Sequence, residues 1–157
     1  MTSSAEQEQQ QSKQIVCQLF EASNQQDIEK IAQLVSITNY SFHFSGMPPM
    51  DWNRHIQLFT AFNSAFSDLH RNIEDMVAEG GGKVAVRFTI TGTHKGEFQG
   101  VPPTDKKVSF DAMDFLTIID GKITEEWVTA DMMGLMQQIG AIPGESHATG
   151  TSRSTRS

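Results

Sequence analysis

Trp127, Asp131 and Asp114 have a spacing that suits acid/base chemistry. Trp127 and Asp131 are four residues apart, so their side chains point to the same face if the segment is a β-strand. Asp114 joins that face if strand 107–119 pairs with strand 122–131 without a bulge, because directly opposite residues share one side of a sheet. A carboxyl group held against an apolar, aromatic surface has a raised pKa and can transfer protons near neutral pH. The three side chains therefore form a candidate site for general acid/base catalysis.

Each of these side chains also has a simpler structural interpretation. Asp131 can be the N-cap of a short helix that follows the last strand. Asp114 can be a solvated or interface carboxylate, and Trp127 a core or interface residue, if their face of the sheet does not line a cavity. A bulge would turn part of a strand over and separate the side chains. The local sequence leaves these alternatives open.

An Asp-Gly pair at 120–121 predicts the hairpin that these strands need. Both central positions of a tight hairpin turn require positive φ, and apolar residues flank the pair on both sides. Upstream, alternating apolar residues predict two more strands joined by three glycines at 80–82. The expected long strands are 69–79, 83–93, 107–119 and 122–131.

The first half of the chain has helical periodicity instead. Apolar residues recur at three- and four-residue spacing in the segments that follow Lys13, Asp27 and Asp51, and Asp27 can cap the second of these helices. Residues 40–44 are expected to be a short extended segment. Helices followed by long strands predict an α+β fold, in which three N-terminal helices cover one face of a cone-shaped, curved antiparallel sheet. The open mouth of such a cone is a natural small-molecule site.

Length and composition indicate a single domain. The chain has 157 residues, enough for one hydrophobic core. We expect the domain to span residues 13–142. The Gln-rich segment 1–12 and the Ser-, Thr- and Gly-rich segment 143–157 are predicted to be disordered, because they offer little apolar surface to bury.

Composition also argues against several classes of partner. The net charge of −7 argues against binding to nucleic acid, which requires a basic face. Cys17 is the single cysteine, so no internal disulfide can form, and this suits a reducing compartment. We see no signal peptide and no apolar run of about 18 residues, so we expect a cytoplasmic protein without a membrane partner. No spacing of His, Cys and Asp matches a metal site, and the glycines at 80–82 lack the Lys-Ser/Thr of a phosphate loop.

Seven blocks of the chain form an ordered pattern: 66–70, 77–87, 92–98, 100–104, 120–123, 126–127 and 131–140. Taken together and in this order, they resemble the SnoaL-like polyketide cyclases of the nuclear transport factor 2-like superfamily. The resemblance extends from about residue 59 to 140, with a vaguer match before it. It implies the same cone of curved sheet and three helices that the periodicity predicts.

The resemblance also implies an activity. The founding cyclases close a ring by intramolecular aldol condensation without metal or cofactor, and one aspartate that matches Asp131 is their general acid/base. The chain departs from the family on the preceding strand, where the positions of the cyclases' polar partners hold Phe115 and Thr117. These positions have the opposite parity to Asp114, so the family's register and the hairpin register above agree only if a bulge intervenes.

Our leading hypothesis is an enzyme that acts on a small hydrophobic carbonyl or polyketide-like compound without a cofactor or metal. Asp131 would be the acid/base, Trp127, Phe44 and His94 would shape the pocket, and Asp114 would be a second polar group. The alternative is a non-catalytic domain that binds a small hydrophobic ligand or serves as a dimeric scaffold. In either case we expect a homodimer or higher homo-oligomer, because the sheet face not covered by helices carries apolar residues, among them Met113, Phe115 and Val128.

Overall fold

The computed structural model describes residues 3–143 and has the predicted α+β architecture. The predicted tail 143–157 lies outside this part of the chain except for its first residue. Four helices and five strands make up the described residues, in the chain order α1 (Ser4–Asn24), α2 (Ile28–Leu34), β1 (Ser41–Phe44), α3 (Trp52–Ala65), β2 (His70–Ala78), β3 (Lys83–Thr93), β4 (Lys107–Ile119), β5 (Lys122–Ala130) and α4 (Met132–Gln138).

The five strands form one mixed sheet in the order β1-β5-β4-β3-β2. The pairs from β2 to β5 are antiparallel, as expected, but β1 runs parallel to β5. The prediction of a wholly antiparallel sheet is therefore wrong at this edge. Because β1 is not joined to β5 by a hairpin, no turn forces the two strands to run in opposite directions.

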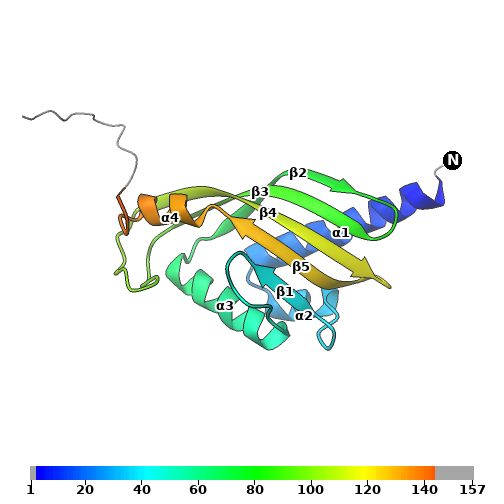
Figure 1. Ribbon diagram of the computed structural model, residues 1–157, viewed down its shortest axis with the longest axis horizontal. Coiled ribbons are helices and arrows are strands. Elements are labelled where there is room, and N and C mark those ends of the chain that lie inside the picture. Colours follow the sequence, from blue (N-terminus) through cyan, green and yellow to red (C-terminus); the bar gives the residue numbers. More distant parts are fainter. Residues whose placement is uncertain (1–2, 144–157) are drawn as a thin grey trace, which may run out of the picture.

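The three N-terminal helices lie on one side of the curved sheet, and α4 lies at the end of β4 and β5 (Figure 1). Alternate residues of β3 and β4 point toward these helices and are buried, as the strict alternation of their burial shows. The core lies between the two layers, and the opposite face of the sheet is left without a helix covering it.

Helix α1 begins at Ser4, well before the expected start at Lys13. The side chain of Ser3 accepts a hydrogen bond from the backbone N–H of Glu6, and the Glu6 carboxylate accepts one from the N–H of Ser3. This reciprocal cap satisfies backbone donors that would otherwise be left free at the helix start. Residues 4–12 are thus helical, and the prediction that segment 1–12 is disordered is wrong for them.

A bulge in the β4–β5 hairpin decides which side chains face the helices. The turn forms as predicted, with positive φ at Asp120 and Gly121. Ile118 then pairs with Ile123, but the next pair joins Thr117 to Glu125 and leaves residue 124 without a partner. A single extra residue moves every later side chain of that strand to the other face.

As a consequence, Asp114 lies opposite Val128, and Phe115 lies opposite Trp127. The bulge-free pairing of Asp114 with Trp127 is therefore wrong. Val128 lies on the same face as Asp114 and lines the interior, so its predicted place on the uncovered outer face is also wrong. Met113 and Phe115 do lie on the outer face, with exposed fractions of 60% and 47%.

Candidate functional site

A cavity of about 230 Å³ lies between the concave face of the sheet and the helices. Most of its wall is apolar and aromatic, with contributions from α1, α2, α3 and all five strands. Four titratable side chains interrupt this wall: His55, Arg71, Asp114 and Glu126. A largely apolar cavity with a few polar groups on its wall is typical of a small-molecule site.

Asp114 and Glu126 form a buried carboxyl pair in this cavity. Both residues are 4% exposed. Glu126 lies opposite Leu116, so the two acids are diagonal neighbours on one face of β4 and β5. Burial raises the pKa of Asp114 well above its usual value, and the charge of Glu126 and a hydrogen bond between the two side chains add to this.

A hydrogen bond between two carboxyl groups requires that one of them holds a proton. The raised pKa of Asp114 favours the state in which Asp114 holds a proton. Oδ1 of Asp114 is buried and has no hydrogen-bond partner among the described residues. The pair therefore combines a carboxyl group that favours its protonated form with a second carboxyl group beside it, and Oδ1 of Asp114 is left to accept a hydrogen bond from a ligand.

Tyr40 and His55 extend the pair into a chain of hydrogen bonds. The Tyr40 hydroxyl donates to Oε2 of Glu126 over 2.5 Å, and the same hydroxyl lies 3.1 Å from Nδ1 of His55. Because the hydroxyl proton is directed at Glu126, its oxygen accepts from Nδ1 of His55. Burial raises the pKa of Tyr40, and the charge of Glu126 acts in the same direction.

The position of His55 is set by the N-terminus of α3 and by aromatic packing. Asp51 caps α3 by accepting a hydrogen bond from the N–H of Arg54 over 2.9 Å. One turn later, the imidazole stacks on Phe42 with ring centroids 3.9 Å apart. Burial lowers the pKa of His55, the charge of Glu126 opposes this, and the charge of Arg71 adds to it. A neutral imidazole that carries its proton on Nδ1 can donate this hydrogen bond to the Tyr40 hydroxyl.

Arg71 brings a positive charge to the same cavity from β2. Its backbone is fixed by Asn24, whose side-chain amide accepts from the Arg71 N–H and donates to the Arg71 carbonyl. Its guanidinium lies over the ring of Phe59, 5.3 Å from the centroid. Burial lowers the pKa of Arg71 to about 10, and the charge of Glu126 opposes the decrease. Arg71 therefore stays protonated at neutral pH.

The arrangement can exchange protons with a ligand away from bulk water. Two neighbouring carboxyl groups in an apolar site cannot both ionise easily, so together they act as an acid and a base. Removal of a proton next to a carbonyl group and reprotonation of an alkoxide are reactions that such a pair can carry out.

Comparison with known proteins identifies the family to which this scaffold and site belong. The profile of the SnoaL-like polyketide cyclases matches residues 13–139. The chain belongs to the SnoaL-like polyketide cyclase family. This agrees with the resemblance that the sequence blocks carry and with the curved sheet and helices of the fold.

The relatives of this SnoaL-like chain include a cyclase with a named substrate. The nogalonic acid methyl ester cyclase of Streptomyces nogalater is 32% identical over 84 residues, which cover 54% of this chain and 63% of the relative. The match therefore spans somewhat less than two thirds of that cyclase.

Two solved structures have the same fold over most of their length. AclR from Streptomyces galilaeus, described as a candidate hydroxylase, is 29% identical with a TM-score of 0.78, and the match covers 85% of this chain and 83% of AclR. IdmH from Streptomyces antibioticus, described as a candidate polyketide cyclase, is 27% identical with a TM-score of 0.74, covering 82% of this chain and 98% of IdmH. The differing descriptions indicate that one scaffold hosts more than one chemistry.

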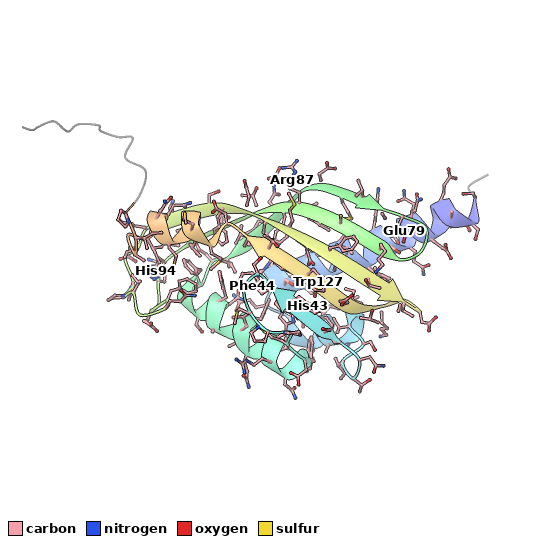
Figure 2. All side chains as sticks on the ribbon, viewed as in Figure 1. His43, Phe44, Glu79, Arg87, His94 and Trp127 are labelled. Atoms are coloured by element: carbon pink, nitrogen blue, oxygen red, sulfur yellow. The ribbon has the colours of Figure 1, made fainter. Side chains whose placement is uncertain are left out.

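Within this SnoaL-like chain, two of the five predicted site residues line the cavity. Phe44 and Asp114 are part of its wall. Trp127 is not, because the bulge turns it to the outer face, where it is 51% exposed. There it stacks on His43 with ring centroids 3.6 Å apart, as the two labelled side chains in Figure 2 illustrate.

His94 is buried but is not part of the cavity wall. It has no exposed surface, and its Nδ1 accepts a hydrogen bond from the Thr104 N–H over 3.3 Å. Its ring stacks on Phe66. Figure 2 shows it near α4, far along the sheet from Phe44 and Trp127. His94 follows β3 on its apolar parity, as expected, but its side chain does not line the cavity.

Asp131 is the N-cap of α4 and is exposed. Its carboxylate accepts a hydrogen bond from the N–H of Gly134 over 2.9 Å. The neighbours Ala130 and Met132 line the cavity, but the Asp131 side chain does not. The structure thus places the expected acid/base at a helix start, as the simpler interpretation allowed, and the carboxyl groups inside the cavity belong to Asp114 and Glu126.

Four polar residues of the site were missed in the sequence, and each had some local signal. His55 falls on the apolar stripe of α3, three residues before Leu58 and four before Phe59. Arg71, in β2, shares the parity of the buried Leu69 just before that strand. Tyr40 had a weaker signal. So did Glu126, because the face on which its side chain lies depends on the bulge.

Among residues 3–143, no group of three His, Cys, Asp or Glu side chains is arranged to hold a metal ion. No helix in the described part of the chain is long and apolar enough to cross a membrane.

Proposed function

We propose that this SnoaL-like chain is a polyketide cyclase that closes a ring by intramolecular aldol addition, with the Asp114–Glu126 pair as its acid/base. The observation that carries the proposal is a pair of neighbouring carboxyl groups buried in the wall of an apolar cavity. The proposal replaces Asp131, whose carboxylate is exposed and engaged in capping α4.

The reaction begins with the pair holding one proton. A free carboxylate oxygen of the pair removes a proton from the carbon next to one substrate carbonyl, which leaves an enolate. The enolate carbon attacks a second carbonyl carbon of the same molecule, so that a carbon–carbon bond forms and that oxygen becomes an alkoxide. The pair, now doubly protonated, returns one proton to the alkoxide. The product is an isomer of the substrate, and the pair regains its starting state.

Tyr40 and His55 are positioning residues in this scheme. The hydroxyl bond to Oε2 fixes the Glu126 carboxylate, and His55 fixes the hydroxyl. Because both partners are buried or largely buried, this chain of donors holds the charge of Glu126 in place without water. The aromatic walls from Phe44, Phe59 and Phe88 exclude water from the enolate, which protects it from premature protonation.

A substrate of this site is a flat, mainly apolar molecule with two carbonyl groups. Nogalonic acid methyl ester is the first compound to test, because the curated relative is named for it. Incubation of the purified chain with this compound in D₂O should yield the ring-closed isomer by liquid chromatography. The recovered substrate should carry deuterium at the carbon next to its carbonyl group by mass spectrometry, because reversible enolate formation exchanges that proton. Both signals should disappear in a folded Glu126→Gln variant.

Unchanged turnover in Glu126→Gln would exclude the proposed acid/base. A ligand that stays bound and chemically unchanged, without deuterium exchange, would instead identify the chain as a binding domain. Native mass spectrometry of the same samples detects the retained ligand.

We also propose that the chain forms a homodimer through the outer face of the sheet. Met113, Phe115 and Trp127 lie together on β4 and β5 in this face, and each is about half exposed or more. Contiguous apolar patches of this kind usually mark interfaces, and a two-fold contact uses the same patch on both copies. Light scattering at micromolar concentration should give twice the mass of one chain, and the mass of a single chain would contradict this proposal.

A further inference from the structure

Arg71 is a permanent cation on the cavity wall with few partners of its own. It is the single Lys or Arg among the described residues that line the cavity. Its guanidinium has five N–H donors. Within residues 3–143 its side chain donates a single hydrogen bond, a long one from Nη1 to the carbonyl oxygen of Ser23 over 3.3 Å. Within residues 3–143 its side chain takes part in no ion pair.

Such a group is expensive to bury unless an acceptor completes its hydrogen bonds. The ring of Phe59 supports one side of the guanidinium but accepts no N–H bond. The backbone of Arg71 is held rigidly by Asn24, so the side chain starts from a fixed point on β2. A planar guanidinium held in this way presents paired N–H groups that match the oxygens of a carboxylate or enolate.

The carboxyl pair lies within electrostatic reach of Arg71. Arg71, Asp114 and Glu126 line the same cavity of about 230 Å³, and the guanidinium lies over Phe59 of its wall. The charge of Glu126 raises the pKa of Arg71 against the effect of burial, in agreement with this placement. A ligand in the cavity can therefore meet the carboxyl pair with one atom and the guanidinium with another.

We propose that Arg71 is an oxyanion-binding residue, which receives an anionic oxygen of the ligand while the Asp114–Glu126 pair exchanges the proton. The inference rests on the proposed function for the identity of the reacting oxygen, but the binding itself does not depend on turnover. The ligand class is then an acidic, flat carbonyl compound. The oxygen can be an enolate or phenolate oxygen that loses its proton, or that of a carboxylate substituent.

Three probe compounds distinguish an enolate-type or phenolate oxygen from a carboxylate oxygen. 4-Nitrophenol carries an oxygen that titrates near neutral pH and changes colour when it ionises, 2-naphthoate carries a fixed carboxylate, and 2-acetylnaphthalene is a neutral compound of similar size. Affinities are measured by calorimetry for the full chain, and the ionisation of bound 4-nitrophenol is followed by absorbance. Since each tenfold preference for the phenolate over the phenol equals one unit in the pKa of the bound probe, the absorbance titration measures the preference directly.

Arg71→Met is the test variant, and Arg87→Met is its matched control. Arg87 is exposed on β3, away from the cavity, and is labelled in Figure 2. The preference for phenolate over phenol should fall about tenfold or more in Arg71→Met and stay unchanged in Arg87→Met, with equal affinity of all three proteins for 2-acetylnaphthalene. A parallel loss for 2-naphthoate identifies a carboxylate subsite, and a loss for 4-nitrophenol alone identifies an enolate-type site.

Equal preferences in wild type and Arg71→Met would overturn the proposal, as would failure of both anionic probes to bind at millimolar concentration. A second measurement needs no variant. In the wild-type chain, the Nε–H signal of Arg71 should shift on addition of an anionic probe and not on addition of 2-acetylnaphthalene; an unmoved signal under saturation also overturns the proposal.

The test of Arg71 and the test of the proposed cyclase reaction can succeed or fail independently. If turnover and deuterium exchange are absent but the anion preference depends on Arg71, the oxyanion site stands and the cyclase assignment fails. If turnover depends on Glu126 and the anion preference does not depend on Arg71, the reverse holds.

Discussion

The inner and outer faces of the β4–β5 hairpin carry similar side chains in opposite surroundings. On the inner face, Asp114 and Glu126 are buried among aromatic residues. On the outer face, Glu125 pairs with His43 at 3.2 Å beside the half-exposed ring of Trp127. Both faces combine acid and aromatic groups, and adjacent residues of one strand supply them.

The difference teaches that burial, rather than residue type, decides whether an acid beside an aromatic ring on this hairpin has the raised pKa that acid/base catalysis needs. On the inner face, desolvation and the charge of Glu126 raise the pKa of Asp114 and keep a proton in the pair. On the outer face, solvent screens the charges, and the apolar side chains form the surface through which we propose that two copies associate. The predictions below test this division, from the largest expected effect to the smallest.

The largest effect should come from neutralising an inner acid. Glu126→Gln and Asp114→Asn should each lower kcat by about 10²–10⁴-fold, because the pair loses its acid/base function. Glu125→Gln is the matched change on the outer face and should leave kcat nearly unaltered. Steady-state kinetics on the folded variants measures both, and similar losses in Glu125→Gln and Glu126→Gln would remove the distinction between the faces.

A charge placed on the outer face should weaken association. Phe115→Glu should raise the dimer dissociation constant by about tenfold or more, since a charge is then buried in an apolar interface. Asn53→Glu adds the same charge on an exposed position of α3 and should have little effect. Sedimentation velocity across a dilution series measures both, and kcat per chain should change little. Identical dissociation constants would move the interface elsewhere.

The buried pair should also leave a signature in stability against pH. Since burial raises the pKa of Asp114, the folded state retains a proton that the unfolded state releases above about pH 4. Stability therefore falls as pH rises toward the raised pKa, with a slope of at most about 1.4 kcal/mol per pH unit.

Asp114→Asn should flatten this decline and stabilise the chain between pH 7 and 9, a range above the titration of His55, whose pKa burial lowers. Asp111→Asn, a change at an exposed position of the same strand, serves as control. Urea unfolding at each pH supplies the values, and parallel curves for wild type and Asp114→Asn would argue against a proton shared in the pair.

The smallest effect is expected at Asp131. Asp131→Ala should lower the free energy of unfolding by about 1 kcal/mol, because α4 loses its cap, and Asp131→Asn should be almost neutral. Turnover by both variants should stay close to wild type. A large decrease of kcat in folded Asp131→Asn would return this residue to the reaction.

Much of the fold is determined by local sequence. The Asp-Gly pair fixes the hairpin because few residues tolerate positive φ at both positions, and it forms where expected. The apolar stripe after Asp51 predicts α3, and its cap is present. The start of α1 was misjudged because the cap formed by Ser3 and Glu6 precedes the apolar positions that mark a helix in sequence.

What the tertiary structure decided is which side of the last strand faces the cavity. Alternation tells which side chains share a face, but the parity of a strand carries no information about a bulge further along it. At residue 124 one unpaired position turns Trp127 outward and Glu126 inward, and the packing of the helices then encloses one face and leaves the other open. The sequence thus indicated Asp114 and Asp131 as candidate acids, whereas long-range pairing and burial brought Asp114 together with Glu126 in the cavity and left Asp131 exposed, because a pKa depends on surroundings that the chain assembles from distant segments.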